Sequence, residues 1–257
     1  MATLYDAPSS YYSMVARLAL LEANVPFDNR RMDIHVAKEQ LTSWYRALNP
    51  HMTVPSLVTD QRIFTDSRDI LRFASAKAGD AWADADSVQH ANIVKIVDTF
   101  YQIPIEDLTF GKAMVKFPVL RFVFPRLLGK ILKKLRNELA TCTDPDAVRA
   151  KVAVNEGRIA YFTQGNLADK LDVERNRILS FLDGIPTPSA NLFGEKTSSA
   201  DIVCCVLLGR LKMAGEYGLV ESYPALDAWF SNIQRSDHFK QADIWMKFQL
   251  SRILLRR

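Results

Sequence analysis

The chain has 257 residues and a formal net charge of +4; 48% of its residues are hydrophobic and 24% are charged. These values are typical of a globular protein with one large domain or two small ones. Three cysteines are too few for a disulfide framework, and no Cys/His spacing predicts a zinc site, so no metal is expected. Because no signal peptide and no long apolar stretch are recognisable, we expect a cytoplasmic protein.

The first part of the chain alternates between strand-like and helix-like patterns. Apolar residues recur either every second residue or at helical spacing, and Asp and Pro occur at the turns between the segments. In chain order the sequence predicts strand 2–5, helix 14–21, strand 26–34, helix 37–48, strands 53–58 and 62–65, and helix 66–78. This order predicts a compact α/β unit with a small mixed sheet.

Strand signals stop near Asp84, and only helical patterns follow. The apolar stripes predict helices over 86–108, 145–183, 198–214 and 223–236. We therefore expect an α/β unit over 1–78, a linker over 79–86 and an all-helical domain over 87–257.

Polar pairs mark the starts of the first and third predicted helices: Ser9-Ser10 and Asp66-Ser67. The free N–H groups and the positive dipole end of a helix N-terminus favour anions, and a hydroxyl beside them lowers the pKa of a thiol. The alternative for both pairs is a helix cap without further function.

Four stretches, SSYYSMVARLAL, LNPHMTVPSLV, FTDSRDIL and GEKTSSADIVCCVLLGRL, together resemble the glutathione transferase superfamily over almost the whole chain. The most specific part is Asn-Pro followed by Val-Pro and, eleven residues later, by an acidic-Ser pair. Within the superfamily the chain looks most similar to the tetrachlorohydroquinone dehalogenase-like and zeta-like branch. The resemblance implies a thioredoxin-like N-terminal domain, an all-helical C-terminal domain, glutathione as co-substrate, a homodimer and a role in detoxification.

The resemblance also implies which residues bind glutathione. Asp66 and Ser67 correspond to the pair that binds its γ-glutamyl end. Val54 corresponds to the residue whose backbone pairs with the cysteinyl part, and Pro55 to the cis proline that orients it. Gln40 matches a position that reaches the glycine end in zeta-class members.

The family's thiolate-stabilising serine falls on Ser10 when the stretch is aligned from Arg17. Ser13 is the second candidate for this role and Ser9 the third. In the dehalogenase a cysteine follows the serine by two positions, and Tyr12 stands there in this chain. A tyrosine cannot form a mixed disulfide, which argues against reductive dehalogenation and against cysteine-assisted isomerisation.

Four aromatic residues are expected near the electrophile: Tyr11, Tyr12, Tyr101 and Phe110. The alternative is that the two adjacent tyrosines only pack, with their hydroxyls toward water. The late Ser198–Asp201 stretch predicts a structural capping box, with a hydroxyl cap and an acid three residues on.

Two basic, apolar-rich segments remain: an insertion over about 110–145 and the tail from Asp243 to Arg257. Between Lys112 and Arg136 the insertion has eight basic and no acidic residues. Such segments either pack their apolar side chains on the helical domain, which we favour, or lie on an anionic membrane or a protein partner. Pro118 and Pro125 predict that the insertion is not one continuous helix.

The sequence thus favours a glutathione transferase that activates the glutathione thiol with a serine hydroxyl for attack on a small hydrophobic electrophile. The alternative is a catalytically weak protein of the same fold that serves as a binding module through the insertion and the tail. Nucleic-acid binding is not expected, because no binding motif accompanies the charge.

Overall fold

The computed structural model describes residues 1–254. One four-stranded sheet has the strand order β2-β1-β3-β4 and comprises β1 (Ala2–Asp6), β2 (Phe27–Arg31), β3 (Ser56–Val58) and β4 (Ile63–Phe64). β1 pairs parallel with β2 and antiparallel with β3, and β3 pairs antiparallel with β4. The parallel pair requires a crossover, which α1 (Tyr11–Glu22) provides.

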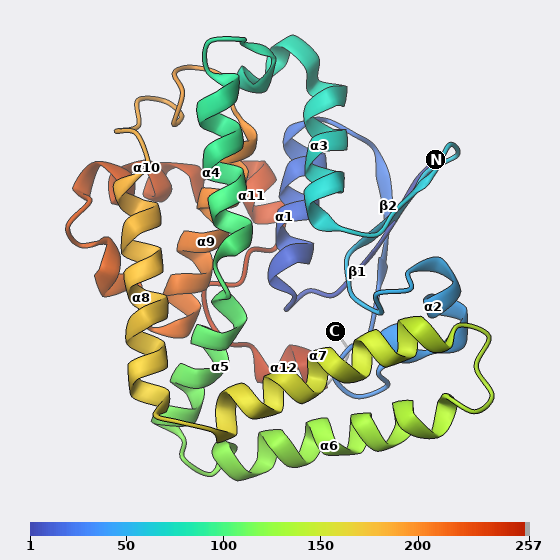
Figure 1. Cartoon of the computed structure of the whole chain (residues 1–257). Helices are drawn as coiled ribbons and strands as arrows, with labels where there is room; N and C mark the ends of the chain where they lie inside the picture. The colour runs from blue at the N-terminus through green and yellow to red at the C-terminus, as the bar shows by residue number, and fades with distance from the viewer. Residues whose placement is uncertain (255–257) are drawn as a thin grey trace.

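Helices α1 and α3 (Ser67–Ala78) pack against each other beside the sheet (Figure 1). The predicted helix over 37–48 is wrong in extent: a 3-10 turn η1 (Glu39–Leu41) precedes a short α2 (Ser43–Leu48). Lys38 has a left-handed backbone, with φ 55°, so a right-handed helix cannot run through it. The 3-10 helices η2 (Gly79–Ala81) and η3 (Ala83–Ala85) occupy the expected linker, whose role as a domain boundary stays a prediction.

The rest of the described chain is helical: α4 (His90–Gln102), α5 (Ile105–Lys116), α6 (Leu120–Glu138), α7 (Pro145–Thr163), α8 (Leu167–Asp183), α9 (Ser199–Ala214), η4 (Tyr217–Val220), α10 (Pro224–Ile233), α11 (Asp237–Gln241) and α12 (Leu250–Leu254). Two long predicted helices are interrupted. Pro104 ends the first, because a proline has no N–H and favours extended backbone at the preceding Ile103. Gly165, with φ 69°, lies at the second break.

The two prolines of the insertion behave differently. The prediction that the insertion is not one continuous helix is confirmed, because Pro118 lies between α5 and α6, whereas α6 continues through Pro125. The side chains of Leu128, Leu132 and Leu135 are buried on the side of α6 that packs against α7. This packing offsets the hydrogen bond that Pro125 cannot donate.

Helix α9 forms the centre of the molecule and contacts α1, α3, α4 and α5. Its residues are buried from Ser199 to Leu211, and one continuous apolar core joins the sheet unit to the helices. The predicted capping box is confirmed, because the Ser198 hydroxyl accepts from the Asp201 N–H and the Asp201 carboxylate accepts from the Ser198 N–H.

Candidate functional site

The start of α1 presents three serines in different environments. Ser10 is the N-cap, and its Oγ accepts a hydrogen bond from the Ser13 N–H at 3.3 Å. Because the oxygen accepts this bond, its hydroxyl proton is left to donate to another acceptor. The first turn of α1 has no acidic residue that would offset the positive end of the helix dipole.

The other two serines have partners elsewhere. Ser13 is fully buried, and its Oγ accepts from the Ala7 N–H at 3.3 Å, so it holds the loop between β1 and α1. The Ser9 Oγ lies 2.7 Å from the Nε2 of His35. Of the three serines, only Ser10 caps the N-terminus of α1, where the positive end of the helix dipole lies.

The Val54-Pro55 peptide bond is cis, as the resemblance implies. The side-chain amide of Asn49 donates to the carbonyl oxygens of Thr53 at 2.9 Å and Thr65 at 3.2 Å. The buried side chain of Asn49 therefore links Thr53, directly before Val54, to Thr65, directly before the N-cap of α3. Sequence reasoning quoted the Asn-Pro motif but missed this positioning role.

Two predicted binding residues form the start of α3. Asp66 is its exposed N-cap and accepts from the Arg68 N–H at 2.7 Å. Ser67 is buried, and its hydroxyl lies 3.0 Å from the Tyr101 hydroxyl. The Tyr101 ring stacks on Tyr12 at 5.9 Å between ring centroids. The structure thus brings Ser67, Tyr101 and Tyr12 together.

The aromatic residues divide into two groups. Burial, helped by the charges of Glu106 and Asp66, raises the pKa of Tyr12 to about 12, so its hydroxyl keeps its proton near neutral pH. Tyr11 packs beside it in the core, 1% exposed. Phe110 instead lies on α5 against Phe124, and no ring contact among residues 1–254 joins it to Tyr12 or Tyr101.

Gln40 lies in η1, where its side-chain nitrogen donates to the Ile34 carbonyl at 3.3 Å. Its Oε1 is buried without a hydrogen-bond partner in the described chain. A buried amide oxygen without a partner is costly, so a hydrogen bond from a bound ligand would stabilise it.

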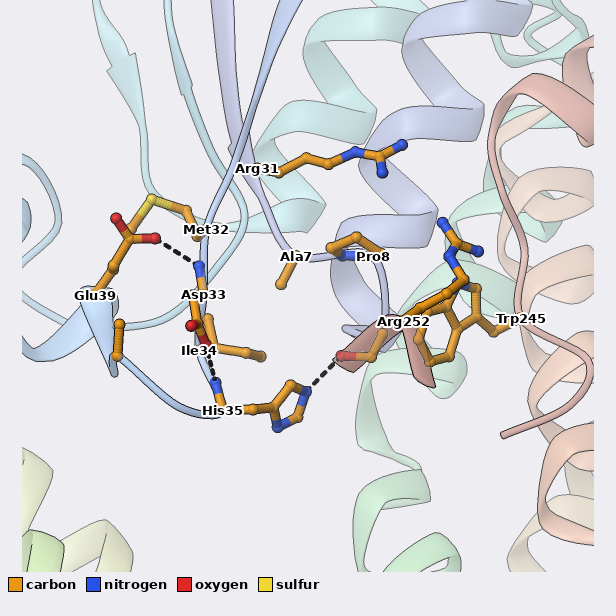
Figure 2. A pocket seen from close by; sticks show the side chains of 12 residues that line it. Ala7, Pro8, Arg31, Met32, Asp33, Ile34, His35, Glu39, Trp245 and Arg252 are labelled. Atoms are coloured by element: carbon orange, nitrogen blue, oxygen red, sulfur yellow. Dashed lines mark hydrogen bonds between the residues drawn. The ribbon is translucent and has the colours of Figure 1, made fainter. Parts of the chain in front are cut away.

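A cavity of about 250 Å³ opens beside the α1 start (Figure 2). Three segments line it: the loop at Ala7–Ser9, residues 31–39, and the C-terminal Trp245 and Arg252. Of the three serines only Ser9 lines it, and Val54, Asp66 and Ser67 do not. The contribution of the C-terminal residues was missed, since nothing in their local sequence pattern points to this loop.

The C-terminal segment, residues 242–254, is attached to the α1 start by Arg17. Buried Arg17 pairs with Asp6 and donates from Nε to the Ala242 carbonyl at 2.7 Å and from Nη2 to the Asp243 carbonyl at 3.2 Å. Nearby, the carboxylate of Asp243 accepts from both Nη atoms of Arg252. Burial of Ile244 and Trp245 shows that this part of the predicted tail packs on the protein. Residues 255–257 of the predicted tail lie outside the described residues.

Arg210 of α9 reaches the same loop from the helical side. It is 6% exposed and donates from Nη2 to the Ser9 carbonyl at 3.1 Å, while its guanidinium lies 5.2 Å from the Tyr11 ring centroid. Among the described residues it forms no ion pair, and Glu106, the acid whose charge it feels, is bonded to Arg158. The α1 start therefore lies beside a buried cation that no carboxylate contacts.

The insertion supports the other side of the site. Helices α6 and α7 form an antiparallel pair, the α6–α7 hairpin, one end of which lies near α2 in Figure 1. Leu135 and Val148 of this hairpin enclose Met52, which lies two residues before Val54 and is fully buried. Lys151 donates to the His51 carbonyl at 3.2 Å. The hairpin thus holds the segment that leads to the cis bond.

No group of three or more His, Cys, Asp or Glu side chains in the described part of the chain is placed to hold a metal ion. Within residues 1–254, no helix is long and apolar enough to cross a membrane.

A thioredoxin-like sheet unit with a cis proline, followed by an all-helical domain, defines a two-domain protein of the class that glutathione transferases represent. Residues 4–82 match the family model described as "Glutathione S-transferase, N-terminal domain". Residues 148–237 match the one described as "Glutathione S-transferase, C-terminal domain". The chain belongs to the glutathione S-transferase superfamily.

Among curated proteins, the chain is 26% identical over 242 residues to the tetrachloro-p-hydroquinone reductive dehalogenase of Sphingobium chlorophenolicum, covering 94% of this chain and 95% of that protein. Similar solved structures include glutathione transferase F7 from Populus trichocarpa, with TM-score 0.59, 19% identity, and coverage of 96% of this chain and 100% of that one. Isozyme E7 from Drosophila melanogaster has TM-score 0.62 and 16% identity, with coverage of 95% and 90%. These structural similarities confirm the predicted fold.

Proposed function

We propose that the protein is a glutathione transferase in which the Ser10 hydroxyl donates a hydrogen bond to the glutathione thiolate. The observation that carries this proposal is the position of Ser10 as the N-cap of α1, where its oxygen accepts from the Ser13 N–H and its proton is left for an anion. The helix dipole and the buried charge of Arg210 both favour a thiolate over a thiol at this point.

The remaining glutathione contacts follow the resemblance. Asp66 and Ser67 are proposed to bind the γ-glutamyl end at the start of α3, Val54 to pair through its backbone with the cysteinyl part, and Gln40 to reach the glycine end. The buried, unpartnered Oε1 of Gln40 supports its assignment. Binding at Ser67 would replace or share its present bond with Tyr101.

The proposed reaction is addition or displacement at an electrophilic carbon: the thiolate sulfur forms the new bond, and a leaving group departs or a proton is taken up. Tyr12 and Tyr101 would form one wall of the electrophile site. Reductive dehalogenation, which the name of the 26% identical relative describes, is not proposed. Tyr12 lacks a thiol, and burial raises the pKa values of Cys204 and Cys205 well above that of an ordinary thiol.

Calorimetric titration with reduced glutathione tests the proposal, together with the ultraviolet absorbance of the thiolate near neutral pH. We expect wild-type protein to bind glutathione with a thiolate band, and Ser10→Ala to lose the band. Ser10→Asn is the stability control, because Asn caps helices as well as Ser, whereas Ala costs about 1 kcal/mol. Ser9→Ala is the neighbouring-hydroxyl control and should keep the band. A band that survives Ser10→Ala would disprove the role of Ser10.

The same titration addresses the binding-module alternative. No binding at millimolar glutathione would favour a fold-family member without transferase activity. Sedimentation of the same sample checks the homodimer, which stays a prediction from the resemblance.

A further inference from the structure

The end of α5 and the outward side of α6 expose an unusual combination of side chains. Six large apolar residues of this region are exposed: Val115, Phe117, Val119, Phe122, Val123 and Leu127. Phe117, Val119 and Phe122 have the largest exposed fractions of the six, 54%, 63% and 65%. We call this surface, together with the cations described next, the α5–α6 outer face.

Five cations of the same stretch are Lys116, Arg121, Arg126, Lys130 and Lys133. None of them forms an ion pair with any residue between 1 and 254, whereas Lys112 and Arg136 of the same insertion are paired with Glu216 and Glu156. No acidic residue occurs between Lys112 and Arg136. The α5–α6 outer face therefore keeps its positive charge in the folded protein.

Helical spacing places four of these side chains in one row along α6. Phe122, Arg126, Lys130 and Lys133 follow one another at intervals of three or four residues, so they form one row. The opposite side of α6 contains the buried leucines that pack against α7. In Figure 1, α6 is the outermost helix along the lower edge of the molecule. The row begins with the apolar Phe122 and continues with three basic side chains.

We propose that the α5–α6 outer face binds the surface of an anionic lipid bilayer. Exposed aromatic and aliphatic side chains next to unpaired Lys and Arg are the features by which an amphipathic helix inserts its apolar side chains between headgroups and holds its cations against anionic lipids. A second copy of this chain fits less well, because a two-fold contact would bring the five cations of each face together.

The start of the C-terminal segment is already engaged by the protein itself. Ala242, Ile244 and Trp245 are buried against the protein, and Asp243 is engaged by Arg252 and Arg17. These first residues of the segment are therefore not free to contact a membrane, whereas the α5–α6 outer face is exposed.

Flotation of the full chain with lipid vesicles tests the proposal. We expect binding to vesicles of phosphatidylcholine with phosphatidylglycerol, little binding to phosphatidylcholine alone, and weaker binding at high salt. A Phe117→Ser/Phe122→Ser variant should bind about tenfold less, since both apolar side chains are lost from the interface. Arg126→Gln/Lys130→Gln/Lys133→Gln, which neutralises the three cations of the row, should reduce binding by at least about tenfold.

The matched control is Val154→Ser/Val173→Ser, which changes two exposed valines outside the face and should bind as wild type does. Thermal unfolding checks that all variants fold. Failure of the wild type to bind anionic vesicles at low salt, or equal binding by the Phe variant, would overturn the proposal. A wild-type dimer in sedimentation that the Phe variant abolishes would assign the face to a second copy and would overturn it too. None of these outcomes depends on glutathione.

Discussion

The C-terminal segment and the α6–α7 hairpin are both basic and rich in apolar residues, yet they hold opposite sides of the candidate site by different means. The C-terminal segment is held through charge, by Arg17 and by the Asp243–Arg252 pair. The hairpin encloses Met52 mainly with apolar side chains, supplemented by the Lys151–His51 hydrogen bond and the Arg46–Glu138 ion pair, and it leaves its other face exposed. The two segments have similar compositions, so composition alone could not predict how each is attached. The attachment depends on the residues elsewhere in the chain that each segment contacts.

The largest expected effect comes from breaking the charged attachment. Arg17→Met leaves Asp6 buried without its ion-pair partner and removes the bonds to Ala242 and Asp243, so the free energy of unfolding should fall by about 3–5 kcal/mol. Urea unfolding followed by circular dichroism measures this loss. Asp6→Asn/Arg17→Met is the control and should lose less, because no buried charge remains uncompensated.

The pH dependence of Arg17→Met sharpens this test. Burial already raises the pKa of Asp6, and loss of the lowering charge of Arg17 raises it further. A carboxyl with a raised folded-state pKa contributes stability that is present below its unfolded-state pKa and is lost as pH rises through the folded-state value. The deficit relative to wild type should therefore be larger at pH 8 than at pH 5. A constant deficit would contradict the uncompensated-charge explanation.

Breaking the apolar attachment of the hairpin should have the next largest effect on stability. Met52→Ala opens a cavity between Leu41, Leu135 and Val148 and should lower the free energy of unfolding by about 2–4 kcal/mol. Met52→Leu keeps the volume and should cost less than about 1.5 kcal/mol. Calorimetric titration of folded Met52→Ala should also show weaker glutathione binding, because Met52 precedes the Val54 backbone. Unchanged affinity would show that the hairpin supports stability alone.

The smallest expected effect concerns the partly exposed Asp243–Arg252 pair. Burial acts to raise the pKa of Asp243, but the hydrogen bonds and charge of Arg252 outweigh it and lower the pKa. A carboxyl with a lowered pKa contributes stability at neutral pH that is lost as pH falls through the folded-state value, below about pH 4. Arg252→Gln should cost about 1 kcal/mol or less at pH 7 and remove part of this acid sensitivity. Equal acid sensitivity in both proteins would contradict the assignment.

The sequence predicted elements whose signals are local. α9 was found because its stripe follows a capping box at Ser198, and α3 because apolar spacing follows Asp66. The second predicted helix was too long because the left-handed backbone of Lys38 leaves no pattern in the sequence. Breaks at Pro104 and Gly165 could have been read from proline and glycine chemistry.

Only part of the candidate site could be predicted from the sequence. The resemblance identified the cis Val54-Pro55 bond, and the polar pairs located both helix starts. The hydrogen bonds that support the loop before α1 could not be predicted, because Arg17 donates to a carbonyl 225 residues away and Arg210 to one 201 residues away. A carbonyl acceptor carries no residue-specific signal, so one sequence cannot indicate such a pairing.

The attachment of Arg17 to Ala242 also sets an order of events during synthesis. A chain made from its N-terminus exposes β1 and α1 first, and domains generally begin to fold in that order. The loop that contains Ser9 and Ser10, however, lacks its C-terminal support until residues 242 and 243 have left the ribosome. The helix start that is made first therefore gains these two hydrogen bonds only after the C-terminal segment has been made, and the proposed contact of Ser10 with glutathione would depend on this late attachment.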